Sequence, residues 1–330
     1  MIKIAQIGCG YWGPNILRNL VVNSNCCVKT VVDSSADRRE FVRKLYPAIK
    51  TTDNMEAILN DDSIKAVVIS TPACTHFDIA LKCLLSGKHC LVEKPLAMTV
   101  KEIDSLDEVA KKHNLVLMAG HTFLYNSAVI YLKKLVDNGD LGEIRYIHSE
   151  RLNLGRIRSD IDALWNFAPH DVSIIQFLLN GLHPISVCIH GMDYIQNNIH
   201  DVVFMNIKYP NKLMANIHVS WLAPKRVRCL TVVGSKKMAV YDDIAEDKIA
   251  IYDKGIDRKA VLGEHMDFDN DAILKFNYRD GDLLFPKVDF QEPLKQEISH
   301  FVDCILNGTK CITDSAHARQ VTAILSGDCL

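Results

Sequence analysis

A lysine and a histidine, far apart in the chain, carry the side chains best suited to move a proton at an alcohol carbon. Lys94 follows an apolar run, His89 to Glu93, and precedes Pro95, a residue that permits a cis peptide bond. An ammonium group in this place can hold a developing alkoxide. Most lysines are solvated surface residues, but the position directly after a strand and beside a proline favours a chemical role for Lys94.

His170 is the second candidate. It lies in the segment 165–171, which leads into the apolar stretch Val172 to Leu179. Pro169 suits a first helical turn, so we expect His170 near a helix N-terminus, where the dipole disfavours imidazolium and leaves a base that can accept a proton. We expect Asp171 to serve the helix start. The other histidines are interpreted as structural, except His76 and His121.

The elements that position these residues begin at the N-terminus. An apolar strand, Ile2 to Ile7, leads into a glycine-rich turn and then into a helical stretch, Pro14 to Val22. Gly8 allows the tight turn, Gly10 lets the backbone approach a pyrophosphate, and Gly13 lets helix pack closely on strand. Free N–H groups at the helix start suit a diphosphate. The pattern predicts dinucleotide binding.

Asp33 favours NAD over NADP. It ends the next apolar run, Val28 to Val32, and its carboxylate is placed to accept hydrogen bonds from the adenosine ribose. Its charge would repel a 2′-phosphate. Arg38 and Arg39 follow closely and could tolerate a phosphate, so this preference is weaker than the prediction of dinucleotide binding.

Alternating strands and amphipathic helices over residues 1–120 predict a doubly wound parallel sheet of the Rossmann type. The expected strands are Lys65 to Ser70, His89 to Glu93 and Leu115 to Ala119, and the expected helices are Thr75 to Leu85 and Val100 to His113. Ligands bind at the C-terminal ends of such strands. Those ends carry Ser70-Thr71-Pro72 and Glu93-Lys94-Pro95.

Residues 121–330 are expected to form a second, α+β domain with a largely antiparallel open sheet. A helix is predicted from about Ser127 to Asn138, followed by strands with alternating apolar residues at Glu143 to Asn153, Asp201 to Tyr209, Leu213 to Val219 and Arg228 to Val233. Turn residues at Pro210-Asn211 and Gly234-Ser235 indicate hairpins.

The end of the chain returns to helix. The polar stretch Gly255 to Lys287 predicts an irregular excursion, and Asp267 to Asp271 resembles a calcium loop that lacks the required glycine and glutamate. We therefore expect no calcium site. A helix from Glu292 to Leu306, closed by Asn307-Gly308, precedes a last helix from about Asp314 that could pack back on the first domain.

Bulk properties narrow the class of protein. The chain has 330 residues, enough for two domains, with 48% hydrophobic and 24% charged residues and a net charge of −2. This charge gives no reason to expect nucleic acid or an anionic membrane as partner. The chain starts directly in a strand and no apolar run is long enough to cross a membrane, so we expect a cytoplasmic protein.

Cysteine usage gives no sign of a metal. The 11 cysteines are odd in number and include no C-x-x-C pair. Most, such as Cys83 and Cys90, lie in apolar segments, where free cysteine behaves as a small hydrophobe. We expect reduced thiols and neither structural zinc nor any other metal.

Four segments in this order resemble the glucose–fructose oxidoreductase/inositol dehydrogenase (Gfo/Idh/MocA) family: Gly8 to Gly13, Thr71 to His76, Glu93-Lys94-Pro95-Leu96-Ala97 and the late His170. The resemblance spans nearly the whole chain and implies a Rossmann domain followed by an α/β domain whose open sheet supports a homo-oligomer, dimer or tetramer. It implies that Lys94 lies between nicotinamide and substrate and that His170 is the base. Many members carry an aspartate where this chain has Asn166.

The resemblance and the turn pattern together define an expected cofactor site. Its residues are Gly8, Gly10, Tyr11, Trp12, Gly13, Asp33, Ser70, Thr71, Pro72, His76, Glu93, Lys94 and His121.

A narrower resemblance concerns the family branch that acts on nucleotide-linked sugars, including the UDP-N-acetylglucosamine and UDP-N-acetylglucosaminuronate 3-dehydrogenases. The segments that carry it are 10–15, 120–126 and 151–156 through 171. Arginines before the expected catalytic helix suit a diphosphate or a carboxylate, although an exposed basic loop would look the same. The substrate residues expected from this likeness are Tyr125, Asn126, Arg151, Arg156, Arg158, Trp165, Asn166 and His170.

The sequence thus predicts an NAD-dependent oxidation of a sugar C3 hydroxyl, with Lys94, His170 and Asn166 as catalytic residues. Lys94 could be the base in place of His170. A keto-sugar reductase or a dehydrogenase of a free sugar or inositol would use the same chemistry. A non-catalytic NAD-binding sensor or scaffold is the alternative from another class, and the presence of both Lys94 and His170 argues against it.

Overall fold

The computed structural model describes the chain except for residues 156, 160, 259–275 and 329–330, and it divides into two compact units. Unit 1 comprises Met1–Ser127, Leu164–His183 and Phe290–Leu330, and unit 2 comprises Ala128–Ala163 and Pro184–Asp289. The chain therefore returns to unit 1 twice, whereas the sequence suggested one boundary after residue 120 and a final helix that could pack back on the first domain. It returns because three later helices bury their apolar faces in unit 1.

Unit 1 contains a six-stranded parallel sheet, which confirms the predicted doubly wound fold. Its strand order is β3-β2-β1-β4-β5-β6. The order reverses between β1 and β4, and a crevice at this switch point is where such sheets bind ligands. The strands are β1 (Ile2–Ile7), β2 (Cys26–Val32), β3 (Lys50–Thr52), β4 (Ile64–Ile69), β5 (His89–Glu93) and β6 (Leu117–Gly120).

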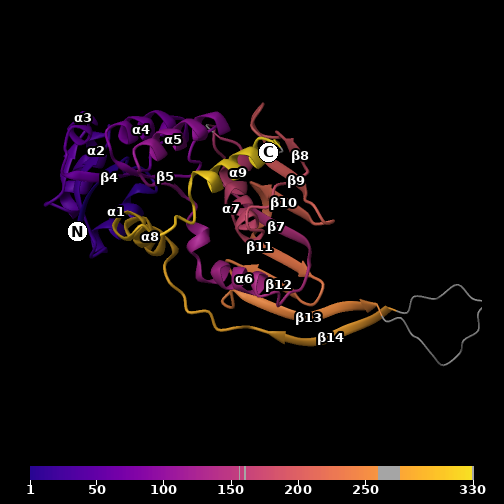
Figure 1. Cartoon of the computed structure of the whole chain (residues 1–330). Helices are drawn as coiled ribbons and strands as arrows, with labels where there is room; N and C mark the ends of the chain where they lie inside the picture. Colours follow the sequence, from indigo (N-terminus) through magenta and orange to yellow (C-terminus); the bar gives the residue numbers. More distant parts are fainter. Residues whose placement is uncertain (156, 160, 259–275, 329–330) are drawn as a thin grey trace, which may run out of the picture. The chain divides into compact units, whose positions relative to one another are not determined.

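Helices cover both faces of this sheet. α4 and α5 pack together on one face, and α1 and α8 pack together on the other (Figure 1). A capping box of Thr99 and Glu102 starts α5, and Ser35 caps α2. The elements are α1 (Gly13–Val22), α2 (Ala36–Leu45), α3 (Glu56–Leu59), η1 (Ala73–Thr75), α4 (His76–Leu85), α5 (Val100–Lys112), η2 (Thr122–Tyr125), α7 (Ala163–Leu178), α8 (Pro293–Asn307) and α9 (Ser315–Leu325).

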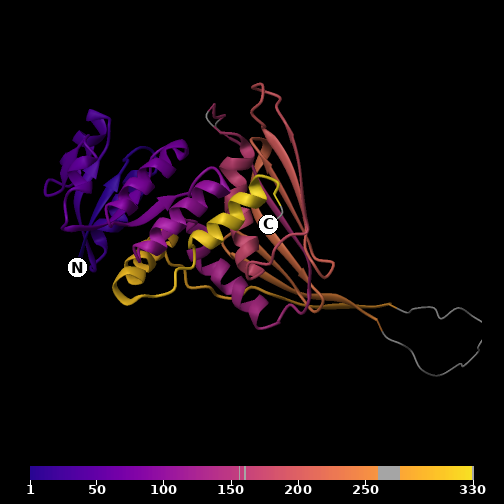
Figure 2. The same ribbon diagram turned by 45° about the horizontal axis from the view of Figure 1, so that its top comes forward.

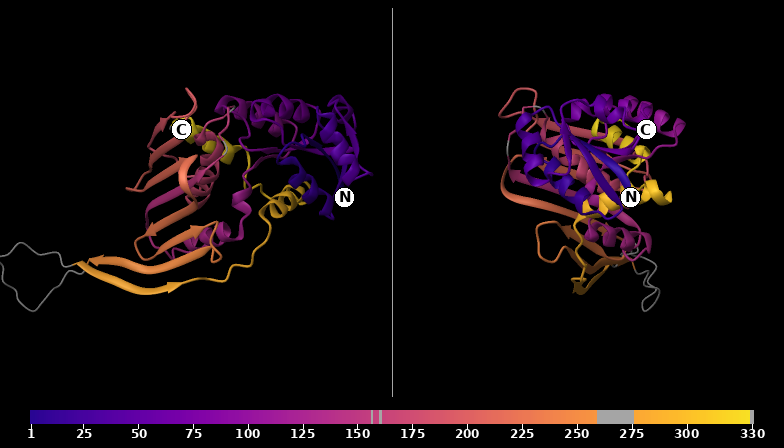
Figure 3. Two further views of the ribbon diagram at one scale, coloured as in Figure 1. Left: turned by 180° about the vertical axis from the view of Figure 1, so that it is seen from behind. Right: turned by 90° about the vertical axis from the view of Figure 1, so that its left-hand side faces the viewer.

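Unit 2 holds an eight-stranded sheet with the order β14-β13-β12-β11-β7-β10-β9-β8 (Figure 3). Its pairs are antiparallel except that β7 and β10 run parallel. The hairpins expected at Pro210-Asn211 and Gly234-Ser235 are present. The elements are α6 (Ser127–Asp137), β7 (Ile144–Leu154), β8 (Ser186–Met192), β9 (Val202–Lys208), β10 (Met214–Ser220), β11 (Leu222–Gly234), β12 (Met238–Asp242), β13 (Ile249–Arg258) and β14 (Phe276–Leu284).

The sequence predicted an irregular excursion over residues 255–287. This prediction is wrong for residues 255–258 and 276–284, which belong to strands β13 and β14. β13 and β14 form a long antiparallel hairpin (Figure 2). β13 begins with the buried Ile249 and Ile251. Further along the pair, cross-strand ion pairs join Lys254 to Asp280 at 2.9 Å and Arg279 to Asp253 at 2.9 Å. Opposite charges on facing strands stabilise such pairing without a hydrophobic pattern. The calcium-like segment Asp267 to Asp271 lies outside the described residues.

Among the residues that the structure describes, no helix combines the length and the apolar character needed to cross a membrane. Ten cysteines are described, and each is a free thiol.

Candidate active site

The glycine-rich turn has the shape that the sequence predicts. Gly8 has a φ of +88°, and a Cβ atom there would lie 2.7 Å from the Ser70 carbonyl oxygen. A Cβ on Gly13 would lie 2.8 Å from the Gly8 oxygen, whereas one on Gly10 would meet no described atom within 4 Å. The Gln6 side-chain amide donates to the Gly8 and Gly13 oxygens at 2.8 and 3.0 Å. The turn is thus held rigidly around open space over Gly10, which fits a pyrophosphate.

The Asp33 carboxylate lies beside this turn. Its two oxygens accept the Cys9 N–H at 2.6 Å and the Ser35 N–H at 2.8 Å. Each oxygen keeps a second lone pair for a ribose hydroxyl. Arg39 donates to the Asp33 backbone oxygen at 2.8 Å and pairs with Asp53 at 3.4 Å, so its guanidinium is already engaged.

Two aromatic side chains follow Gly10. Tyr11 is 91% exposed and Trp12 is 40% exposed at the start of α1. The Trp12 side chain is hydrogen-bonded to the Glu93 carboxylate, which joins the glycine-rich turn to the end of β5. Exposed aromatic rings over a dinucleotide turn are surfaces against which a cofactor can pack.

His76 connects the ends of two strands. It is buried, and its Nδ1 lies 2.7 Å from the Pro95 carbonyl oxygen while its Nε2 lies 2.9 Å from that of Thr71. Burial lowers the pKa of His76 despite these contacts, so the ring stays neutral and one nitrogen donates. His76 therefore holds the Thr71-Pro72 turn against the segment that carries Lys94.

Lys94 reaches the helix that carries His170. The Lys94–Pro95 peptide is cis. The Lys94 Nζ donates to the backbone oxygen of Asn166 at 2.9 Å. Asn166 and His170 are four residues apart on α7 and share one face of the helix. The His170 ring packs against Phe123 with ring centroids 4.8 Å apart. The structure thus brings Lys94, Asn166 and His170 into one region of unit 1.

The predicted start of this helix is wrong. α7 begins at Ala163 and contains Pro169 in its interior, so His170 lies well inside the helix and the dipole argument does not apply. Asp171 is 2% exposed and lies in the middle of the helix, not at its start. The apolar face begins upstream, at the buried Ala163 and Leu164, and outweighs the proline.

The carboxyl groups of Glu93, which directly precedes Lys94, and of Glu297 lie close enough to interact electrostatically. Glu297, on α8, is 1% exposed, and one of its oxygens accepts the Thr122 hydroxyl at 2.9 Å. Its other oxygen is buried and has no hydrogen-bond partner among the described residues. Burial, and next the charge of Glu93, raise the pKa of Glu297. Burial also raises the pKa of Glu93 to about 7. Between them these carboxyl groups retain a proton near neutral pH.

Sequence reasoning missed Glu297, although a signal was present. Leu294, Glu297 and Phe301 follow the three- and four-residue spacing of the buried stripe of α8. A charged residue at a core position of an amphipathic helix is unusual. It was the one sign in the sequence that this glutamate faces inward.

His121 is also buried. It is 2% exposed and lies edge-on to His317, with ring centroids 5.3 Å apart. Burial lowers the pKa of both rings, that of His317 to about 4. Both imidazoles are therefore neutral at pH 7. His317, on α9, was not predicted.

The predicted substrate residues are divided between the two units. In unit 1, Tyr125 and Asn126 are 3% and 4% exposed, and the Tyr125 hydroxyl lies 3.1 Å from the Thr313 hydroxyl. Trp165 is half-buried on α7. Their assignment to a substrate stays a prediction.

In unit 2, Arg151 is buried on β7, where its partner in the register is Arg228 on β11. Asp243 pairs with Arg228 at 3.2 Å. Arg158 is exposed, and Arg156 lies outside the described residues. Like charges opposite each other on neighbouring strands are unfavourable, and the Asp243 carboxylate offsets part of this repulsion. Arg228 was missed because the register of β11 is not readable from sequence.

Comparison with known proteins identifies the family of this chain. Residues 2–121 match the profile of an oxidoreductase family with an NAD-binding Rossmann fold, and residues 129–240 match the GFO/IDH/MocA C-terminal domain. The UDP-N-acetylglucosamine 3-dehydrogenase of Acidithiobacillus ferrooxidans is 30% identical over 68% of this chain and 69% of its own length. A crystal structure of that enzyme superposes with a TM-score of 0.79 at 25% identity, covering 98% of this chain and 95% of the other.

The scyllo-inositol 2-dehydrogenase (NAD(+)) of Bacillus subtilis is 25% identical over 95% of this chain and 89% of its own length. For several other curated relatives the matched part spans only 60 to 61% of their own length. The two profiles together cover most of the chain. This protein is an NAD-binding oxidoreductase of the Gfo/Idh/MocA family.

Proposed function

We propose that this protein oxidises the C3 hydroxyl of a UDP-N-acetylhexosamine to the 3-keto sugar, with NAD as acceptor, as a step towards an amino sugar of a surface polysaccharide or lipid. The observation that best supports this reaction is the 2.9 Å hydrogen bond from Lys94 Nζ to the Asn166 carbonyl oxygen, one helical turn before His170. The likeness to the A. ferrooxidans enzyme supports the choice of substrate.

The residues of the site have separate roles in an alcohol oxidation. Bound NAD supplies the hydride acceptor, so the chain itself has to hold the alcohol and take its proton. His170 accepts the hydroxyl proton at a ring nitrogen. Lys94 donates a hydrogen bond to the same oxygen and stabilises its negative charge. The C3–H bond breaks with its electron pair, which leaves a ketone. Asn166 acts through its backbone oxygen, which positions the Lys94 amine.

The cofactor preference follows from the turn. Gly8, Gly10 and Gly13 would hold the pyrophosphate, and the Asp33 carboxylate would hold the ribose. NAD is favoured over NADP because Asp33 is charged and Arg39 is engaged by Asp53 and by backbone oxygens. Arg151 is the residue we assign to the anionic part of the substrate.

The nearest alternative is a dehydrogenase of a free cyclitol, favoured by the likeness to the B. subtilis inositol enzyme over 95% of this chain. UDP-N-acetylglucosaminuronate remains a further candidate, since its carboxylate also suits arginine. To separate them, the purified protein is mixed with NAD and, in turn, UDP-N-acetylglucosamine, UDP-N-acetylglucosaminuronate, and scyllo- and myo-inositol.

We expect reduced nicotinamide absorbance with a UDP-sugar only, and a product lighter by two hydrogens whose new ketone maps to C3. Turnover with an inositol and none with either UDP-sugar would replace the proposal by the cyclitol reaction. Tight NAD binding without turnover on any of these compounds would favour a sensor.

We also propose that unit 2 mediates self-association. Tyr146 on β7 and Met214 on β10 are register partners, 48% and 46% exposed, and Phe204 on β9 is 46% exposed. Exposed large apolar side chains on adjoining strands favour an interface between copies. Light scattering of the purified protein should give a dimer or tetramer, and Phe204→Glu should shift it towards monomer.

A further inference from the structure

Three metal-ligating side chains meet at the C-terminal end of α8, apart from the candidate active site. His300 and Cys304 are one helical turn apart on α8, and Cys311 lies in the segment between α8 and α9. The His300 Nε2 and the Cys304 Sγ lie 3.4 Å apart, and the ligand atoms of all three lie within 4.8 Å of one another. Cys304 is 4% exposed. In the part of the chain that the structure describes, this is the only such cluster of three.

The spacing of these atoms matches a tetrahedral zinc ion. Zn–S bonds of about 2.3 Å and Zn–N bonds of about 2.0 Å at a tetrahedral angle place a sulfur and a nitrogen about 3.5 Å apart. The observed distance of 3.4 Å between the His300 Nε2 and the Cys304 Sγ is close to this expected separation. We propose that His300, Cys304 and Cys311 bind one Zn²⁺ ion. Two thiolates and one imidazole are the ligand set that zinc prefers over magnesium or calcium.

The histidine is in the chemical form that a metal needs. The His300 Nε2 accepts the backbone N–H of Ile312 at 3.1 Å. A nitrogen that accepts a hydrogen bond carries a lone pair and no proton. That lone pair points towards the segment that contains Cys311. A zinc ion would take the place of the Ile312 amide, which could then donate to a thiolate sulfur.

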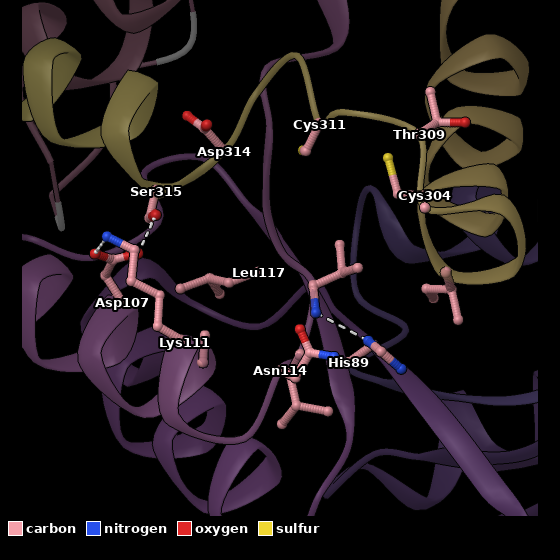
Figure 4. A pocket seen from close by; sticks show the side chains of 15 residues that line it. His89, Asp107, Lys111, Asn114, Leu117, Cys304, Thr309, Cys311, Asp314 and Ser315 are labelled. Atoms are coloured by element: carbon pink, nitrogen blue, oxygen red, sulfur yellow. Dashed lines mark hydrogen bonds and ion pairs between the residues drawn. The ribbon is translucent and has the colours of Figure 1, made fainter.

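A cavity of about 450 Å³ adjoins the cluster. Cys304 and Cys311 line it together with Thr309 and Asp314 (Figure 4). A three-ligand zinc site needs a fourth ligand, usually water, and an ion needs a path of entry. The cavity provides room for both beside the two sulfur atoms.

The ion would fasten a connection that supports the parallel sheet. The Ala119 N–H on β6 donates to the Thr313 carbonyl at 2.8 Å, and Met118 forms a bridge with Asp314. Cys311 stands two residues before Thr313, so a metal bond between Cys311 and α8 would hold this segment against β6. Because zinc binds only the folded arrangement of the three ligands, it should stabilise the protein by mass action.

The test uses the full chain. The protein is stripped with a chelator, reloaded with ZnCl₂ or CoCl₂, desalted and analysed for metal content. We expect one Zn²⁺ per chain, and a Co²⁺ form with a thiolate-to-cobalt charge-transfer band. Cys304→Ser, Cys311→Ser and His300→Gln should each weaken Zn²⁺ binding by about a hundredfold or more.

Cys188→Ser is the matched control. Cys188 also contacts a histidine, His190, at 3.1 Å, but belongs to no described cluster of three ligands. This variant should keep the full zinc content. Zinc retained by a Cys304→Ser/Cys311→Ser double variant, or no zinc bound by the native protein, would overturn the proposal.

A second measurement covers variants that fail to fold. In the native protein, Zn²⁺ should protect Cys304 and Cys311 from alkylation, as read by mass spectrometry of their peptides, and leave Cys188 and Cys74 as reactive as before. Equal labelling of Cys304 and Cys311 with and without Zn²⁺ would contradict the site.

Discussion

The amine of Lys94 lies 2.9 Å from the backbone oxygen of Asn166, so a side chain at the end of β5 contacts the helix that carries His170. Both belong to unit 1. A lysine and a histidine that the sequence suggested as partners are therefore held close together by one compact unit. The contact uses a main-chain oxygen, so it does not depend on the side chain at position 166.

Lys94→Met and His170→Asn should each lower kcat by about a hundredfold or more, because each removes one of the two groups that act on the reacting oxygen. NAD affinity should change little. Steady-state kinetics and fluorescence titration with NAD measure the two effects. Lys101→Met, at an exposed lysine on α5, is the control and should keep full activity. Normal turnover by either site variant would refute its assignment.

Gly10→Ala should weaken NAD binding by about tenfold or more and leave thermal stability unchanged. A Cβ atom at Gly10 meets no described protein atom within 4 Å, so it intrudes only on the space for the pyrophosphate. Gly8→Ala is the matched comparison, because its φ of +88° and the Ser70 oxygen 2.7 Å from the new Cβ strain the fold itself. Calorimetric titration and thermal melts separate the two. A Gly10→Ala variant that binds NAD normally would contradict this placement of the cofactor.

Asp33→Ser should reduce the preference for NAD over NADP by about tenfold, because it removes the charge that repels a 2′-phosphate. The quantity to measure is the ratio of kcat/KM for the two cofactors. Some loss of stability is expected as well, since the carboxylate also accepts the Cys9 and Ser35 amides. Asp37→Asn, an exposed position on α2, should leave the ratio unchanged.

Glu297→Gln should make the protein more stable at pH 8 than the native chain. Burial raises the pKa of Glu297 and that of Glu93, the latter to about 7. A carboxyl group with a raised folded-state pKa binds its proton more tightly in the folded state, so its contribution to stability is lost as pH rises from the unfolded value through the folded one. For Glu93, whose folded-state pKa is about 7, this loss falls between pH 6 and pH 8. The amide keeps an acceptor for Thr122 and cannot ionise.

Urea unfolding at pH 6, 7 and 8 measures how the free energy of unfolding changes with pH. The variant should show a shallower decline than the native protein. Glu292→Gln is the control, because the ion pair with Arg18 lowers the pKa of Glu292 and no titration is expected in this window. Parallel curves for native and Glu297→Gln proteins would show that the buried carboxyl does not titrate there.

Local sequence patterns were sufficient to predict much of the secondary structure of unit 1. The strands β1 and β5 have the predicted limits, and α8 ends at Asn307, followed by Gly308 with a φ of +67°, as the Asn307-Gly308 pair suggested. These elements depend on short-range rules: continuous apolar runs for buried parallel strands, and glycine for a left-handed helix end. The positions of Gly8, Gly13 and Asp33 follow from the same rules.

Elements without an apolar pattern could not be predicted in this way. α2 buries only Val42, and β13 and β14 pair through charged residues. Their stability comes from neighbours in space. The N-terminus of α7 was misplaced for the same reason, since a helix containing Pro169 persists only because its upstream turns are buried.

From the sequence alone, the residue types and their local settings were determined: a dinucleotide turn, a lysine after a strand and a histidine beside an apolar helix. Only the tertiary structure brought Lys94 to the Asn166 carbonyl, buried Glu297 beside Glu93, and gathered His300, Cys304 and Cys311. The physical reason is the distance along the chain over which each kind of interaction acts. Turns and periodicities act over a few residues, whereas a site is formed by the packing of distant segments, whose register and contacts no local pattern encodes.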